Sequence, residues 1–243
     1  MSSSLSHSSP AILLIHGAWH HPEFYATLCK SLEALNYEVV CPRLPSCNDA
    51  VPPTKFLSDD VALIRATAQT LLDKGKRVVA IMHSYGGVVG TDALHGLPIQ
   101  RLIYMTAFVP PRGKSLAGMF GGMLPPFITI DEENALLRVP DPATFFFNDL
   151  SPADAAHWAG KLVVHPKSTQ FDPISHEAYR DIPATYILCE KDAALIPMVQ
   201  ELMISNVKTA GVEMSVEKLD ASHSPFLSMP DKTAALVHKI ASK

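Results

Sequence analysis

The chain has 243 residues, of which 47% are hydrophobic and 18% charged, and its formal net charge is −4. This length fits one large α/β domain, or a core with an inserted lid, better than two independent domains. The sequence holds no basic cluster and no apolar run long enough to span a bilayer. We therefore expect neither nucleic acid nor a membrane as a partner.

The N-terminus and the cysteines indicate the cellular compartment. Residues 1–10 lack the basic start and the apolar core of a secretion signal, so we interpret them as a flexible tail. No C-x-x-C spacing connects the four cysteines, Cys29, Cys41, Cys47 and Cys189. They are typical of reduced, partly buried thiols rather than a disulfide framework, and we expect a cytoplasmic protein.

Short apolar runs typical of buried parallel strands alternate with segments of helical periodicity. Strands are predicted at residues 11–15, 37–41, 77–82, 101–108, 184–189 and 213–219. Helices are predicted at 22–35, from a cap at Ser58 to Gly75, after the third strand to Gly96, from Pro197, and from 228–231 onward. This alternation predicts an α/β fold, a mostly parallel sheet of about six strands flanked by helices.

One segment, residues 110–182, interrupts the alternation. It contains no clear strand and many aromatic side chains, and it is too long for a simple crossover. We predict a helical lid, with one helix from Ser151 to about Gly160, inserted into a core of residues 11–109 and 183–243. Its apolar side chains either line a substrate pocket or form the lid's own small core. The candidate pocket residues are Trp19, Met119, Phe120, Met123, Phe127 and Trp158.

The sequence Met82-His-Ser-Tyr-Gly-Gly87 joins the third strand to the helix that follows it. A strand that ends in His-Ser-x-Gly-Gly and turns at once into a helix is the setting of a nucleophile elbow. This pattern predicts Ser84 as a catalytic nucleophile, with an ordinary turn serine as the alternative. Met82 departs from the pattern, because a small residue usually allows tight packing there.

After the first strand comes His16-Gly-Ala-Trp19. A small residue after His-Gly can offer its backbone N–H to an oxyanion, together with the N–H of the residue after the nucleophile. The predicted donors are therefore Ala18 and Tyr85. A plain glycine turn after a strand would show the same residues.

Acidic residues and a histidine follow the fifth and sixth strands, in Glu190-Lys-Asp192 and Asp220-Ala-Ser-His223. A serine hydroxyl is a poor nucleophile until an imidazole takes its proton and a carboxylate orients that imidazole. We predict His223 as the base and Asp192 as the acid, because Asp192 lies at a strand end. Glu190 and Asp220 remain competitors for the acid role.

The other histidines do not indicate a metal site. His16, His20 and His21 are close in sequence but lack a ligand spacing such as H-E-x-x-H, so we expect no metal and no cofactor. His83, next to the predicted nucleophile, is interpreted as structural.

Together with Tyr104-Met-Thr-Ala-Phe-Val-Pro-Pro111, these motifs resemble the small α/β-hydrolase group that contains plant methylesterases, hydroxynitrile lyases and many fungal relatives. The resemblance spans about residues 11–242. It implies a cofactor-free enzyme with a six-stranded parallel core and a lid before the acid-bearing strand. It also implies the triad Ser84, Asp192 and His223, with Ala18 and Tyr85 as oxyanion donors.

Two departures separate this chain from the lyases it resembles. Lyases carry a lysine after the catalytic histidine, where this chain has Ser224, and a threonine where it has Gly17. Both favour a serine hydrolase that cleaves a small, largely apolar carboxylic ester or lactone through an acyl-serine intermediate. The alternatives are a lyase, a cyclase, C–C bond cleavage, or a small-molecule receptor. A small-molecule substrate is the expected partner, and a homodimer stays open.

Overall fold

The computed structural model describes residues 9–243, and its centre is a six-stranded parallel sheet. The strand order is β2-β1-β3-β4-β8-β9. The strands are β1 (Ala11–Ile15), β2 (Glu38–Val40), β3 (Val78–His83), β4 (Arg101–Met105), β8 (Ala184–Cys189) and β9 (Met214–Leu219). The predicted fold class is confirmed. The fourth strand is shorter than predicted, because the backbone turns at Thr106, whose φ is 40°.

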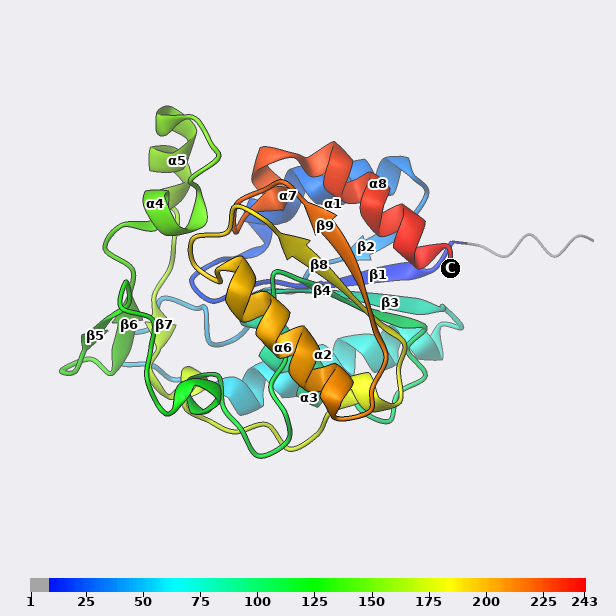
Figure 1. The fold of residues 1–243 in the computed structure, drawn as a ribbon, viewed down its shortest axis with the longest axis horizontal. Coiled ribbons are helices and arrows are strands. Elements are labelled where there is room, and N and C mark those ends of the chain that lie inside the picture. Colours follow the sequence, from blue (N-terminus) through cyan, green and yellow to red (C-terminus); the bar gives the residue numbers. More distant parts are fainter. Residues whose placement is uncertain (1–8) are drawn as a thin grey trace, which may run out of the picture.

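Helices cover both faces of this sheet. In Figure 1, α1, α7 and α8 lie on one face, and α2, α3 and α6 lie on the other. Their bounds are η1 (Pro22–Tyr25), α1 (Ala26–Ala34), α2 (Leu57–Asp73), α3 (Gly86–Ala93), α6 (Pro197–Thr209), α7 (Pro225–Ser228) and α8 (Pro230–Ala241). The predicted cap at Ser58 was wrong. The observed cap is Phe56, two residues earlier, so helix α2 begins at Leu57. The Asp59 carboxylate accepts the Phe56 N–H at 3.0 Å.

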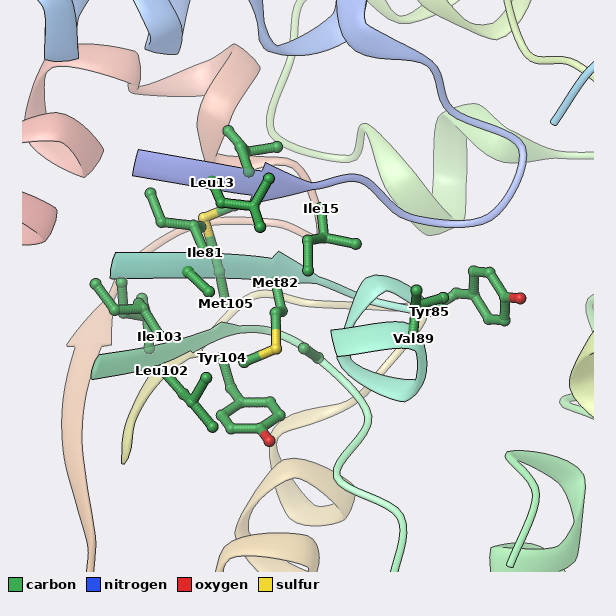
Figure 2. Packing of buried hydrophobic residues seen from close by; sticks show 14 of the residues in the cluster. Leu13, Ile15, Ile81, Met82, Tyr85, Val89, Leu102, Ile103, Tyr104 and Met105 are labelled. Atoms are coloured by element: carbon green, nitrogen blue, oxygen red, sulfur yellow. The ribbon is translucent and has the colours of Figure 1, made fainter. Parts of the chain in front are cut away.

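The core lies between these helices and the central strands, whose residues are almost entirely buried. Figure 2 shows Met82 on β3 with its side chain directed toward α3, on which Val89 lies. A Cβ placed on Gly90 of α3 would lie only 2.4 Å from the Met82 sulfur. The bulky residue before the elbow is therefore accommodated by a glycine on the facing helix.

Residues 110–182, which we call the cap, connect β4 to β8. Most of this segment lies at the end toward which the main strands point, and its last residues run back past α3 to the start of β8 (Figure 1). The prediction that this segment holds no strand was wrong. It contains an antiparallel sheet of β5 (Thr129–Asp131), β6 (Leu136–Arg138) and β7 (His165–Pro166). Such short strands carry no readable alternation, and β6 pairs with β7 across a long stretch of chain. The cap's helical elements are η2 (Ala117–Phe120), α4 (Pro142–Phe146), α5 (Pro152–Ala159), η3 (Ser168–Gln170) and η4 (Ala178–Arg180).

Several smaller predictions can be placed on this fold. Helix α5 begins as predicted, because the Ser151 hydroxyl accepts the Asp154 N–H at 3.2 Å. All four cysteines are free. The predicted flexible tail falls mainly on residues 1–8, which lie outside the described residues. Within residues 9–243, no helix combines the length and apolarity needed to cross a membrane.

Candidate active site

Ser84 lies at a sharp turn between β3 and α3. Its φ of 52° is in the left-handed region, which a non-glycine residue adopts only where the surroundings enforce it. A Cβ on Gly86 would lie 2.3 Å from the Ile15 carbonyl oxygen, and one on Gly87 would lie 2.2 Å from that of Phe108. The two glycines therefore let the first turn of α3 pack against the neighbouring backbone and hold Ser84 in this conformation.

The loop after β1 lies against this turn. A Cβ placed on Gly17 would lie 3.1 Å from the Ser84 Cβ and 2.8 Å from His83 Nδ1. Ala18 and Tyr85 are both buried and line the same cavity as Ser84. Within the described residues, neither backbone N–H of these two donates a hydrogen bond to the protein. Buried N–H groups without partners are rare, so these two are available for a ligand.

On the far side of the cavity, the His223 Nδ1–H donates to Asp192 Oδ2 at 2.7 Å. Both side chains are almost fully buried, with exposed fractions of 3% and 0%. The other carboxylate oxygen of Asp192 accepts the N–H groups of Ala194 and Leu195, each at 2.8 Å. The Thr106 hydroxyl donates to Asp192 Oδ2 as well. Four donors thus satisfy and orient one buried carboxylate.

The competing acids lie elsewhere. Asp220 is 70% exposed and pairs with Lys191, and Glu190 is 44% exposed and pairs with Lys218. Both are therefore committed to solvent-facing ion pairs, and Asp192 is the acid that contacts the imidazole.

His83 joins the loop after β1 to the loop that carries His223. Its Nε2–H donates to the His223 carbonyl at 2.9 Å, and its Nδ1 accepts the Tyr25 hydroxyl at 2.7 Å. The Tyr25 oxygen in turn accepts the Gly17 N–H at 3.1 Å. Burial lowers the pKa of His83 well below its ordinary value, so the ring is neutral. These contacts agree with the structural role predicted for His83.

Residues 12–236 match the family model described as the alpha/beta hydrolase family. The chain belongs to this family. It is 32% identical to "Probable hydrolase R7" of Phoma sp., over 96% of this chain and 99% of the relative. It is 25% identical to "Methylesterase 3" of Arabidopsis thaliana, over 96% of each chain. Among solved structures, a pyrethroid hydrolase from Sphingobium faniae JZ-2 shares the fold with a TM-score of 0.78 and 23% identity, covering 96% of this chain and 97% of the other.

In this α/β hydrolase, the cavity beside Ser84 is narrow and mostly apolar. Its free volume is about 20 Å³, enough for about one water molecule, so a substrate must displace lining side chains. Trp19 and Phe127 line it, as predicted for pocket residues. Phe146, which the sequence analysis did not select, stacks on the His223 ring with centroids 5.3 Å apart. The aromatic run that contains Phe146 was visible in the sequence, but which of its rings faces the site was not.

Four predicted pocket residues lie outside this cavity. Met119 and Phe120 line a separate hollow against α6, because η2 turns toward that helix. Met123 is 70% exposed, in a turn after η2. Trp158 of α5 packs on the buried Phe24 of η1, with ring centroids 5.0 Å apart. Each of these is a correction to the predicted pocket.

A buried carboxylate, Asp60 on α2, anchors Tyr85, the residue after Ser84. The Tyr85 hydroxyl donates to Asp60 Oδ2 at 2.9 Å, and the Ser46 hydroxyl donates to the same oxygen at 2.6 Å. Burial raises the pKa of Asp60 to about 6, although the hydrogen bonds lower it. The sequence gives no signal that Asp60 contacts Tyr85, because the two residues are far apart in the chain.

The histidines after β1 stabilise their own loop. His16 Nδ1–H donates to the Gly17 carbonyl at 2.9 Å, and its Nε2 accepts the Leu44 N–H at 2.9 Å. His20 Nδ1–H donates to the Ala18 carbonyl at 2.7 Å. Burial lowers the pKa of His16 to about 4 and that of His20 to about 3, so both are neutral. Among residues 9–243, no group of three or more His, Cys, Asp or Glu side chains could hold a metal ion.

Proposed function

We propose that the protein is a serine hydrolase that cleaves a small, largely apolar carboxylic ester or lactone. Ser84 is the nucleophile, His223 the general base and Asp192 the orienting acid. One observation carries the proposal: the buried, hydrogen-bonded Asp192–His223 pair faces the same cavity as a serine held in left-handed backbone. Because Asp192 occupies Nδ1 of His223, Nε2 is the nitrogen that can take the serine proton.

The Ser84 hydroxyl makes no hydrogen bond to His223 within the described residues. In enzymes without bound substrate, catalytic hydrogen bonds are often long and tighten only in the substrate complex. Ser84 and His223 line one narrow cavity, which is the arrangement that such a tightening requires.

The reaction follows from these positions. Ser84 Oγ attacks the ester carbonyl as His223 takes its proton, and the free N–H groups of Ala18 and Tyr85 stabilise the oxyanion. The tetrahedral intermediate expels the alcohol, which receives the proton from His223, and leaves an acyl-Ser84. Water, deprotonated by His223, then attacks the acyl group. The bond to Ser84 Oγ breaks, His223 returns the proton to Ser84, and the carboxylic acid is released. A lactone would yield a hydroxy acid by the same steps.

Two further observations favour hydrolysis of an apolar ester. The curated and structural relatives named above include a methylesterase and a pyrethroid hydrolase, both named for hydrolytic activity. In addition, a side chain at Gly17 would collide with His83 and Ser84, so the threonine of the lyase pattern does not fit here without movement.

Labelling and turnover test the proposal. A fluorophosphonate should label the wild type and not Ser84→Ala, and p-nitrophenyl esters of short acids should lose turnover in Ser84→Ala by about 10⁶-fold. Ser115→Ala is the matched control, because Ser115 is also 7% exposed and should leave labelling intact. Equal turnover by wild type and Ser84→Ala would refute hydrolysis by this serine and favour a receptor or a non-hydrolytic reaction.

A further inference from the structure

We propose that Gln170 is a specificity-determining residue that binds a hydroxyl group of the substrate. The preferred substrates are then hydroxyl-bearing esters or lactones. This inference rests on the proposed ester-hydrolase function and narrows its substrate class.

Gln170 is a buried polar side chain with an unpaired oxygen. It is the last residue of η3, is 2% exposed, and lines the cavity that Ser84 and His223 share. Its Oε1 is buried and has no hydrogen-bond partner among residues 9–243. Leaving a buried amide oxygen unpaired costs free energy, so natural proteins rarely keep one without a ligand or a function.

The other polar side chains of the cavity are already committed. The Tyr85 hydroxyl donates to Asp60, and the Trp19 Nε1–H donates to the Leu137 carbonyl at 2.9 Å. Ser84 and His223 serve the reaction itself. Among the cavity-lining residues of the described chain, Gln170 is therefore the polar group left to recognise a substrate away from its carbonyl.

The segment that carries Gln170 is held in place. The Thr169 hydroxyl donates to the Pro166 carbonyl at 2.7 Å and accepts the His165 Nε2–H at 2.7 Å. The His165 ring contacts the rings of Trp19 and Tyr85, with centroids 5.3 Å and 4.8 Å away. Gln170 therefore lies on a segment that packs against Trp19 and Tyr85, next to the proposed oxyanion donors. A specificity residue requires such a fixed position.

A hydroxyl group is the partner that satisfies this amide. The carboxamide presents one acceptor and two donor hydrogens, and a hydroxyl can donate to the first and accept from the second. A hydroxyl group satisfies the Gln170 amide even if the positions of its oxygen and nitrogen are exchanged, because a hydroxyl can both donate and accept. A carboxylate could only accept, and its charge would be costly in an apolar cavity. An alkyl chain would leave the amide unpaired, and sites built this way reject such analogues strongly.

The test compares methyl hexanoate with methyl hydroxyhexanoates that carry the hydroxyl at successive carbons, in the wild type and Gln170→Met. Methionine keeps the length and removes both hydrogen-bonding groups. For the wild type, kcat/KM of the best hydroxy ester should exceed that of methyl hexanoate by about tenfold or more. In Gln170→Met this ratio should fall close to one, because methionine cannot form the hydrogen bonds to the hydroxyl group.

Gln100→Met is the matched control. Gln100 also has a buried Oε1 without a partner, but it precedes β4 at the opposite edge of the sheet, where its Nε2 donates to the Ala241 carbonyl. This variant should keep the wild-type ratio. Thermal melting of all three proteins checks that each is folded.

The outcomes separate the two proposals. Ser84-dependent hydrolysis with the same ratio in wild type and Gln170→Met would overturn the role of Gln170 and leave the ester hydrolase standing. The role of Gln170 is also overturned if folded Gln170→Met loses both substrates equally, or if the wild type does not favour any hydroxy ester. Absence of Ser84-dependent turnover for every ester would overturn both proposals.

Discussion

The carboxyl edge of the main sheet and the cap contribute to the same cavity but are built differently. At the sheet edge, side chains follow strands whose pairing fixes their backbone, and buried hydrogen bonds satisfy them from several directions, as at Asp192. In the cap, the strands have two or three residues, and the cavity-lining Phe127 and Phe146 are positioned by ring packing. One hydrogen bond, from Trp19 after β1, joins this sheet-edge loop to β6. The comparison indicates that residues at the sheet edge carry the proposed reaction, whereas residues of the cap determine which substrates the cavity accepts.

This division predicts that changes at the sheet edge lower kcat or unfold the protein, whereas changes in the cap alter KM and substrate choice. Four substitutions test it, from the largest expected effect to the smallest.

Asp192→Asn should lower kcat by about 10⁴-fold with little change in folding. The asparagine amide would donate to His223 Nδ1 and so place the ring proton on Nε2, where it cannot accept from Ser84. Asp220→Asn is the control and should retain activity, since Asp220 pairs with Lys191 at the surface. Steady-state kinetics on one ester measure both variants, and a small effect of Asp192→Asn would contradict the proposed acid.

Gly87→Ala should destabilise the fold by about 3–5 kcal/mol, because the new methyl would meet the Phe108 carbonyl oxygen at 2.2 Å. Gly160→Ala in the cap is the control: its nearest atoms are at 3.5 Å and its φ is −68°. It should change the unfolding free energy by less than about 1 kcal/mol. Urea unfolding measures both, and similar values for the two variants would argue against a tightly packed elbow.

Asp60 should make stability depend on pH. Because burial raises the pKa of Asp60 from 3.8 to about 6, the folded state keeps a proton that the unfolded chain has lost between these values. Its contribution to stability is therefore fully present below pH about 4 and lost as pH rises through about 6, by about 3 kcal/mol. The difference in unfolding free energy between wild type and Asp60→Asn across this range measures it.

Asp59 supplies the control for that series. Its pKa is lowered, chiefly by the hydrogen bond from Lys55, so Asp59→Asn should keep the fall in stability. A fall of equal size in Asp60→Asn would exclude Asp60 as its source.

Trp19→Phe should raise KM by about three- to tenfold and leave kcat within about twofold, because it removes one hydrogen bond to the cap strand β6. Trp158→Phe, which changes a tryptophan outside the cavity, should alter neither constant. If Trp19→Phe instead lowered kcat alone, the result would indicate that the Trp19 indole positions the loop after β1, which carries Ala18, and not the cap.

The sequence predicted the sheet edge more accurately than the cap. Buried parallel strands read as continuous apolar runs, so β1 and β8 were placed with their observed ends, and the residues just after the strands included Ser84, Asp192 and His223. The pocket was predicted poorly. Aromatic residues such as Phe120 and Phe146 carry the same signal in the sequence, although one faces α6 and the other faces His223.

The sequence alone determined the fold class, the order of the motifs and the candidate reacting groups, because these depend on local periodicity and on strand-to-loop position. Tertiary structure decided that Asp192 rather than Glu190 or Asp220 contacts His223, and that Asp60 supports Tyr85. It also brought Gln170, whose buried amide oxygen is unpaired among the described residues, to the lining of the cavity. These facts come from contacts between residues distant in the chain, which hydrophobic periodicity does not encode.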